Sequence, residues 1–119
     1  MYRPVRKNDF RASGSGHERY VYGDKVPLPN GILDFAKSVY ETMNIPNLSI
    51  DVAFDGKEFY MLEFQVLYFG TVAQRRSNCY YSNIDNNWKL KKERLDLEKV
   101  YVESIISYLN KLRINNDEE

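Results

Sequence analysis

Residues 48–65 read LSIDVAFDGKEFYMLEFQ, and this stretch predicts a β-hairpin from which the rest of the chain can be placed. Apolar and polar residues alternate on both sides of Asp55-Gly56, which is the period of a half-buried strand. The dipeptide Asp-Gly is a strong signal for a tight turn. We therefore expect two antiparallel strands joined at Asp55-Gly56.

The pairing of these two strands follows from their apolar residues. A slip of one residue would turn one whole apolar set toward solvent, so the register should be strongly specified. The register that buries both sets pairs Phe54 with Tyr60, Val52 with Leu62, Ile50 with Phe64 and Leu48 with Val66.

The same register sets Asp51 directly across from Glu63, with Gln65 two residues farther along on that face. Like charges that face each other on neighbouring strands destabilise the pair. A divalent cation would turn this repulsion into attraction, and oxygen ligands of this kind suit Mg²⁺ or Mn²⁺. A solvated face, with the carboxylates shielded by Lys57 or water, is the alternative from the residues alone.

Residues 7–16, KNDFRASGSG, predict an irregular loop because they are rich in Asn, Asp, Ser and Gly. Small residues around Arg11 make an anion cradle plausible, with backbone N–H groups and a guanidinium both available. An ordinary surface loop is the alternative.

The two segments together resemble the C-terminal lobe of the ATP-grasp enzymes, the carboxylate–amine and carboxylate–thiol ligases. The metal ligands of that family are an acid on one strand and Glu-x-Asn on the next. Asp51 and Glu63 fit this spacing, and Gln65 stands where the family has Asn. The family also carries a Phe-Arg-x-Asn loop followed by glycines. Phe10-Arg11 with its following glycines is similar, with Ser13 in place of the Asn.

This resemblance implies a role for each matching residue. Asp51, Glu63 and Gln65 would hold Mg²⁺ (or Mn²⁺), and Arg11 would be the catalytic residue that clamps phosphate or acyl-phosphate oxygens. The residues that would contact ATP are Arg3, Arg11, Ser13, Gly14 and Gly16.

The enzyme class implied is an ATP-dependent ligase that phosphorylates a small carboxylate or a peptide, after which an amine or a thiol displaces the phosphate. The family's other lobe carries the adenine pocket and phosphate-binding lysines. No counterpart of that lobe is recognised in this sequence, so we expect a C-terminal portion that is inactive alone.

Two helices are expected to cover the sheet. The first shows apolar residues at helical spacing, with Asn30 as N-cap and Pro46 after its end. Its expected apolar face is Ile32, Phe35, Ala36, Val39, Tyr40 and Met43. The second should begin after Asp96 and present one apolar face, with Val100 at its border. That face is Leu97, Tyr101, Ile105, Tyr108, Leu109 and Leu112.

The predicted fold class is therefore α+β, a small antiparallel sheet packed by two main helices, like the C-terminal half of an ATP-grasp domain. A length of 119 residues suits one domain, which we place at 1–114. Residues 115–119, NNDEE, have nothing to bury and should fray.

Composition limits the classes of partner. The 17 basic and 17 acidic residues cancel, which argues against nucleic acid as the main partner. The mixture of Arg75 and Arg76 with Tyr80, Tyr81 and Trp88 still leaves a single-strand nucleic-acid binder as an alternative, on a stretch that its Asn content marks as a loop.

The lone Cys79 excludes an internal disulfide and suits a reducing cytoplasm, and no apolar run is long enough to span a membrane. A second functional hypothesis is a non-catalytic interaction domain. If the partner lobe is lost, an apolar edge would stay exposed, and a homo-oligomer could cover it.

Overall fold

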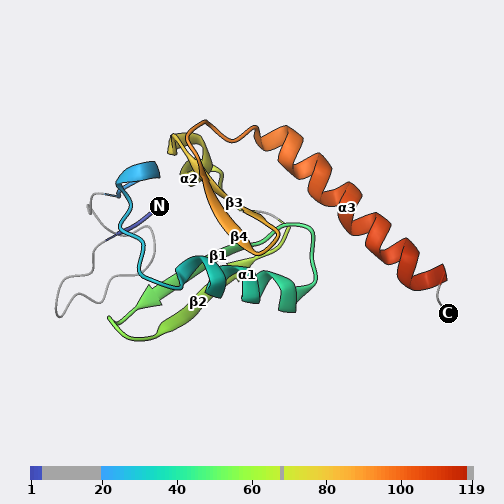
Figure 1. The fold of residues 1–119 in the computed structure, drawn as a ribbon, viewed down its shortest axis with the longest axis horizontal. Coiled ribbons are helices and arrows are strands. Elements are labelled where there is room, and N and C mark those ends of the chain that lie inside the picture. The colour runs from blue at the N-terminus through green and yellow to red at the C-terminus, as the bar shows by residue number, and fades with distance from the viewer. Residues whose placement is uncertain (4–19, 68, 118–119) are drawn as a thin grey trace. The chain divides into compact units, whose positions relative to one another are not determined.

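The computed structural model describes residues 1–3, 20–67 and 69–117 (Figure 1). Within them it contains helices and two antiparallel hairpins, so the α+β class is confirmed. The chain divides into two compact units. Unit 1 comprises Met1–Pro27 and Val72–Leu95, and unit 2 comprises Leu28–Thr71 and Asp96–Glu119.

Unit 2 contains the predicted hairpin, formed by β1 (Ser49–Phe54) and β2 (Phe59–Gln65). The turn between them is organised by the Asp55 carboxylate, whose Oδ1 accepts the backbone N–H of Lys57 at 2.8 Å and of Glu58 at 2.7 Å. Gly56 has φ +97°, a conformation that glycine adopts without strain. The Asp-Gly turn is therefore confirmed.

The register of the hairpin agrees with the prediction at one end and differs at the other. Ile50 lies opposite Phe64 and Asp51 opposite Glu63, as predicted. Beyond Asp51 the register shifts by one residue, so the predicted pairs Val52–Leu62 and Phe54–Tyr60 are wrong. The observed pairs are Val52 with Met61, Ala53 with Tyr60 and Phe54 with Phe59.

The cause of this β-bulge is the length of the turn. Because Asp55 closes a four-residue turn that ends at Glu58, Phe59 and not Tyr60 meets Phe54. β2 must then accommodate one extra residue near Leu62, which is 70% exposed. Tyr60 consequently moves to the polar face, where its hydroxyl lies 3.1 Å from Asp55 Oδ2 and from Glu58 Oε2.

Helix α1 (Ile32–Met43) contacts the apolar face of the hairpin. The Phe59 ring lies 5.4 Å from the Phe35 ring of α1 and 4.7 Å from Phe54, measured between centroids. The expected apolar positions of α1 are half-buried except Tyr40, which is exposed. The N-cap is Gly31, with φ +88°, and not Asn30. Gly31 allows this left-handed start without a Cβ penalty.

Helix α3 (Leu97–Asp117) also belongs to unit 2. Asp96 caps it as predicted, because its Oδ1 accepts the Lys99 N–H at 3.2 Å. The helix continues to Asp117, so residues 115–117 of the expected tail are helical. Its half-buried side chains are Leu97, Val100, Tyr101, Ser104 and Tyr108, whereas Ile105, Leu109 and Leu112 of the predicted packing face are exposed.

Unit 1 contains a second hairpin, formed by β3 (Tyr80–Ile84) and β4 (Asn87–Lys91), where the sequence predicted a loop. Its turn residues Asp85 and Asn86 have φ +53° and +63°, the left-handed pair that matches the twist of a two-residue hairpin. The unit also contains a 3₁₀ turn η1 (Gly23–Lys25), a short helix α2 (Val72–Arg76) and a bridge between Tyr2 and Val21.

The Gly23→Ala substitution should destabilise unit 1 by about 2 kcal/mol. Gly23 has φ +65°, and a methyl group there would lie 2.1 Å from Asn78 Oδ1. Asn78 would have to move and lose its paired hydrogen bonds to Asp24, each 3.2 Å long. Native-state hydrogen exchange of unit 1 amides measures the change.

The matched control is Gly70→Ala, because Gly70 has no positive φ and a methyl group there meets open space. This control should leave exchange unchanged. Equal effects of the two substitutions would contradict the role assigned to the contact with Asn78.

The Asp55 turn predicts a pH dependence. The N–H groups of Glu58 and Lys57 hold the pKa of the Asp55 carboxyl below its ordinary value. Since the folded pKa is lower than the unfolded one, the turn is stabilised above the unfolded pKa, and this contribution is lost as the pH falls through the folded value. A carboxyl ¹³C NMR titration should give a lower midpoint for Asp55 in the protein than in a peptide of residues 53–60. Equal midpoints would contradict this account of the turn.

Candidate metal and phosphate site

Asp51 and Glu63 form a pair of acids on the polar face of the β1–β2 hairpin. They are direct cross-strand partners, and both are exposed. Side chains at opposing positions have Cβ atoms about 5 Å apart. Ile50 and Phe64, their neighbours in the strands, lie on the other face by the alternation of the strands. The acids therefore lie on the face of the hairpin opposite the one where Phe59 contacts Phe35 of α1.

Gln65 joins this pair from the same strand as Glu63. Its Nε2 donates a hydrogen bond to Glu63 Oε1 at 3.3 Å. The amide nitrogen is thus turned to the carboxylate, and the amide oxygen is left for another partner. All three residues predicted as metal ligands are brought together on one face of the hairpin.

The donor set is one that a magnesium–nucleotide complex uses. Mg²⁺ is usually bound through one or two carboxylates together with substrate phosphates, and it keeps several waters. Two carboxylates and an amide oxygen supply that number of protein ligands. Over residues 1–3, 20–67 and 69–117 no group of three or more His, Cys, Asp or Glu side chains could hold a metal ion. Phosphate oxygens would have to complete the coordination.

The other predicted site residues are not placed beside this face. Arg3 belongs to unit 1 and is half-buried, and its Nη1 is buried without a hydrogen-bond partner among the described residues. Arg11, Ser13, Gly14 and Gly16 lie outside the described residues.

Tyr60 is a residue of this face that the sequence pattern assigned to the apolar side. Its hydroxyl contacts Asp55 and Glu58, and the hydrogen bond to Asp55 raises the pKa of the phenol. The length of the turn is the sequence feature that could have predicted the position of Tyr60. A four-residue connection, Asp55–Glu58, puts Phe59 and not Tyr60 opposite Phe54.

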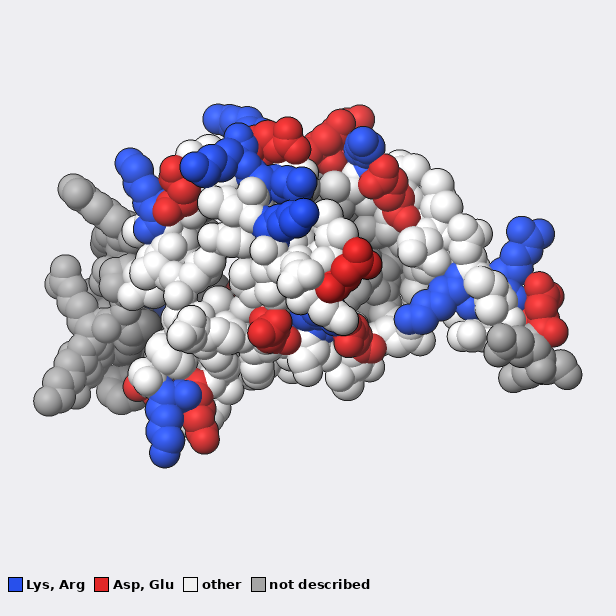
Figure 2. All heavy atoms as spheres, viewed as in Figure 1, with Lys and Arg blue, Asp and Glu red and all other residues white. Residues whose placement is uncertain are grey.

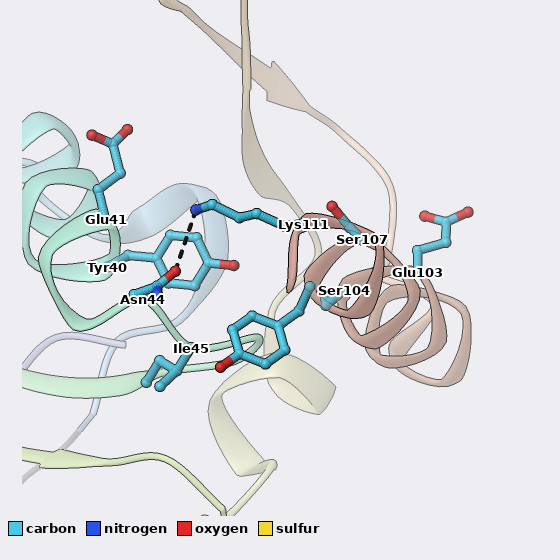
Figure 3. Close-up of a pocket in the computed structure, with 9 residues that line it drawn as sticks. Tyr40, Glu41, Asn44, Ile45, Glu103, Ser104, Ser107 and Lys111 are labelled. Carbon is cyan, nitrogen blue, oxygen red and sulfur yellow. Dashed lines mark hydrogen bonds between the residues drawn. The ribbon is translucent and has the colours of Figure 1, made fainter. Parts of the chain in front are cut away.

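A pocket of about 420 Å³ lies within unit 2, between the end of α1 and the middle of α3 (Figure 3). Two of its polar groups already serve the local structure. Lys111 Nζ donates to Asn44 Oδ1 at 3.3 Å, and the Tyr40 hydroxyl donates to the Pro46 carbonyl at 3.1 Å. The residues that line it are Tyr40, Glu41, Asn44, Ile45, Glu103, Ser104, Ser107, Tyr108 and Lys111.

Two of the basic and aromatic residues of unit 1, Arg76 and Tyr80, are engaged with protein groups. The Arg76 guanidinium lies 5.6 Å from the centre of the Tyr22 ring, and the Tyr80 hydroxyl donates to Glu93 Oε1 at 3.0 Å. The bond to Glu93 raises the pKa of Tyr80. On the face seen in Figure 2, basic and acidic side chains are interspersed. A stacking platform for single-stranded nucleic acid gains no support from these contacts.

Comparison with known proteins finds no matching family model, no similar curated protein and no similar solved structure. Among the described residues, none of the helices combines the length and the apolar character needed to cross a membrane.

Proposed function

We propose that this chain provides the metal- and phosphate-binding part of an ATP-grasp ligase. The observation that carries the proposal is the position of Asp51 opposite Glu63, with Gln65 held to Glu63 on the same open face. The resemblance assigns the metal to these three positions. A cation between the two acids would replace their repulsion across the hairpin with attraction.

The chemistry follows from the charges involved. A carboxylate oxygen of the substrate attacks the γ-phosphorus of ATP, ADP leaves, and an amine or thiol then displaces phosphate from the acyl phosphate. A divalent cation at Asp51, Glu63 and Gln65 would neutralise the negative charge of the phosphates. By the resemblance, Arg11 would stabilise the transferring phosphoryl group, and Arg3, Ser13, Gly14 and Gly16 would bind the triphosphate.

In the ATP-grasp family, adenine and the phosphate-binding lysines are held by a separate lobe. We expect this chain by itself to bind Mg-ATP weakly, because positioning by both lobes supplies much of the affinity and the catalysis. The proposed setting is the cytoplasm, where ATP is abundant and the thiol of Cys79 would stay reduced.

The proposal is tested by calorimetric titration of the chain with ATP in the presence of Mg²⁺, and again in EDTA. We expect a dissociation constant of about 1 mM with Mg²⁺ and weaker binding in EDTA. Release of ADP should not be detected. Binding that is equal with and without Mg²⁺ would reject the metal site. Micromolar affinity with turnover would reject the requirement for a second lobe.

A non-catalytic interaction domain is the second candidate. The observation that favours it is the exposed apolar surface of α3, where Val102, Ile106 and Leu109 are each more than half exposed. Apolar surface of this kind marks sites of protein association.

A further inference from the structure

The neutral charge of the whole chain conceals an uneven division between its two units. Unit 1 contains 12 basic and 5 acidic residues, and unit 2 contains 5 basic and 12 acidic residues. The cancellation that argues against nucleic acid therefore applies to the chain as a whole and not to unit 1. A local excess of positive charge attracts polyanions even where the total charge is zero.

Several cationic side chains of unit 1 come from segments that meet at one end of its hairpin. The pairing of the strands sets Lys91, at the end of β4, opposite Tyr80, at the start of β3. α2 ends at Arg76, shortly before β3 begins. Arg94, just after β4, returns to α2, because its Nη1 donates to the Arg75 carbonyl at 3.3 Å (Figure 1). The basic cluster at this end comprises Arg75, Arg76, Lys91, Lys92 and Arg94.

The basic cluster is not neutralised by ion pairs. Among the described residues the ion pairs are Lys37–Glu41 and Lys99–Glu103, and both belong to unit 2. Two acids stand beside the cluster in the sequence, and each already accepts a hydrogen bond. Glu93 accepts the Tyr80 hydroxyl at 3.0 Å. Asp96 accepts the Lys99 N–H at 3.2 Å. The five cations thus outnumber the neighbouring acids, and all of them except Lys91 are exposed.

Two arginines of the basic cluster are held in position by contacts within unit 1. The Arg76 guanidinium lies over the Tyr22 ring, 5.6 Å from its centre, and Arg94 is held by its hydrogen bond to the Arg75 carbonyl. A guanidinium carries five N–H donors, so each of these groups keeps donors for a ligand. Side chains that are already positioned lose less conformational entropy when a ligand binds.

A polynucleotide backbone matches the chemistry of the basic cluster. Three of the five members are arginines, and a planar guanidinium binds phosphate through paired hydrogen bonds. A polynucleotide carries a phosphate at every nucleotide, so cations on separate elements can all be engaged without a fixed register. An acidic peptide would need carboxylates at the matching spacing. The chemistry therefore favours the polynucleotide.

We propose that the basic cluster binds the phosphate backbone of a polynucleotide, without stacking of the bases. Contacts with about four phosphates make this binding sensitive to salt and independent of base sequence. The proposal is independent of the ATP-grasp proposal, because the basic cluster contains none of the residues assigned there to the metal or to ATP.

Fluorescence anisotropy of a labelled oligouridine of about 20 nucleotides tests the binding by the full chain. The titration is made in EDTA, so that a metal site takes no part. We expect a dissociation constant on the order of 10 μM in about 50 mM KCl. Binding should be about 50-fold weaker in about 200 mM KCl, because four phosphate contacts release counterions. Absence of binding at the lower salt concentration, or binding that salt does not weaken, would overturn the proposal.

Two double variants locate the site. Arg75→Gln with Lys92→Gln removes two exposed members of the basic cluster. This variant should bind at least about tenfold more weakly in the lower salt, and the same rise in salt should then weaken binding only about sevenfold. The matched control is Lys57→Gln with Arg113→Gln, which changes the total charge equally but lies in unit 2. The control should bind as the wild-type chain does. Equal losses in the two variants would overturn the assignment to the basic cluster.

Competition tests the class of ligand. Poly-glutamate with the same number of charges as the oligouridine should displace it at least about tenfold less effectively than unlabelled oligouridine does, because carboxylates at peptide spacing match the basic cluster less well. Displacement by poly-glutamate that is equal or stronger would overturn the polynucleotide and indicate an acidic protein segment as the ligand.

Discussion

The Asp51→Asn and Glu63→Gln variants should each bind Mn²⁺ about 100-fold more weakly than the wild-type chain in the presence of ATP. The same variants should be more stable than the wild-type chain in EDTA, with an unfolding midpoint about 2 °C higher. Both effects have one cause. Two carboxylates that face each other across β1 and β2 repel when no cation is present and act as ligands when one is.

The electron paramagnetic resonance signal of free Mn²⁺ measures the binding, and thermal unfolding in EDTA measures the stability. Asp85→Asn is a matched control, because Asp85 is an exposed acid in the β3–β4 turn of unit 1. It should change neither quantity. If Asp51→Asn and Glu63→Gln lower the stability in EDTA and leave Mn²⁺ binding intact, the two acids serve the fold and the metal site is excluded.

Replacement of Phe59 by alanine should have the largest effect on folding, about 3 kcal/mol of lost stability in unit 2. The Phe59 ring is the point where α1 and the hairpin meet, since it contacts both Phe35 and Phe54. It also lies 3.6 Å from the position that a Cβ on Gly31 would occupy at the start of α1. Its removal would separate the two elements.

Hydrogen exchange of the β1, β2 and α1 amides measures this loss, and Leu62→Ala is its control. Leu62 lies in the same strand but is 70% exposed at the bulge, so its truncation should change stability by less than about 0.5 kcal/mol. Comparable losses in the two variants would show that the Phe59 contacts do not hold α1 to the hairpin.

The position of Asp51 opposite Glu63 could be predicted from the sequence, because strand alternation fixes which residues share a face. Asp51 and Glu63 are paired as the pattern indicated. The bulge was not predictable from alternation, which counts residues and assumes an uninterrupted ladder. The turn length was set instead by the Asp55 carboxylate, which accepts the N–H groups of Lys57 and Glu58.

Two other differences have physical reasons of the same kind. Asp85-Asn86 contains no glycine, yet Asp and Asn tolerate positive φ better than other residues, and so they close a hairpin that composition suggested was a loop. In α3 the apolar residues occupy more than one arc. The helical period therefore predicted the helix but could not tell that Tyr101 and Tyr108 would be half-buried while Ile105 and Leu109 stayed exposed.

The division of the chain into two units has a practical consequence for the study of its folding. Cys79, the buried thiol, and Trp88 each occur once in the chain, and both belong to unit 1. Tryptophan fluorescence and the rate of thiol alkylation therefore report the opening of unit 1. The far-ultraviolet signal of α1 and α3 reports unit 2. If the probes of the two units show different unfolding transitions in the same sample, each unit unfolds with a free energy of its own. If the transitions coincide, the chain unfolds as one cooperative system.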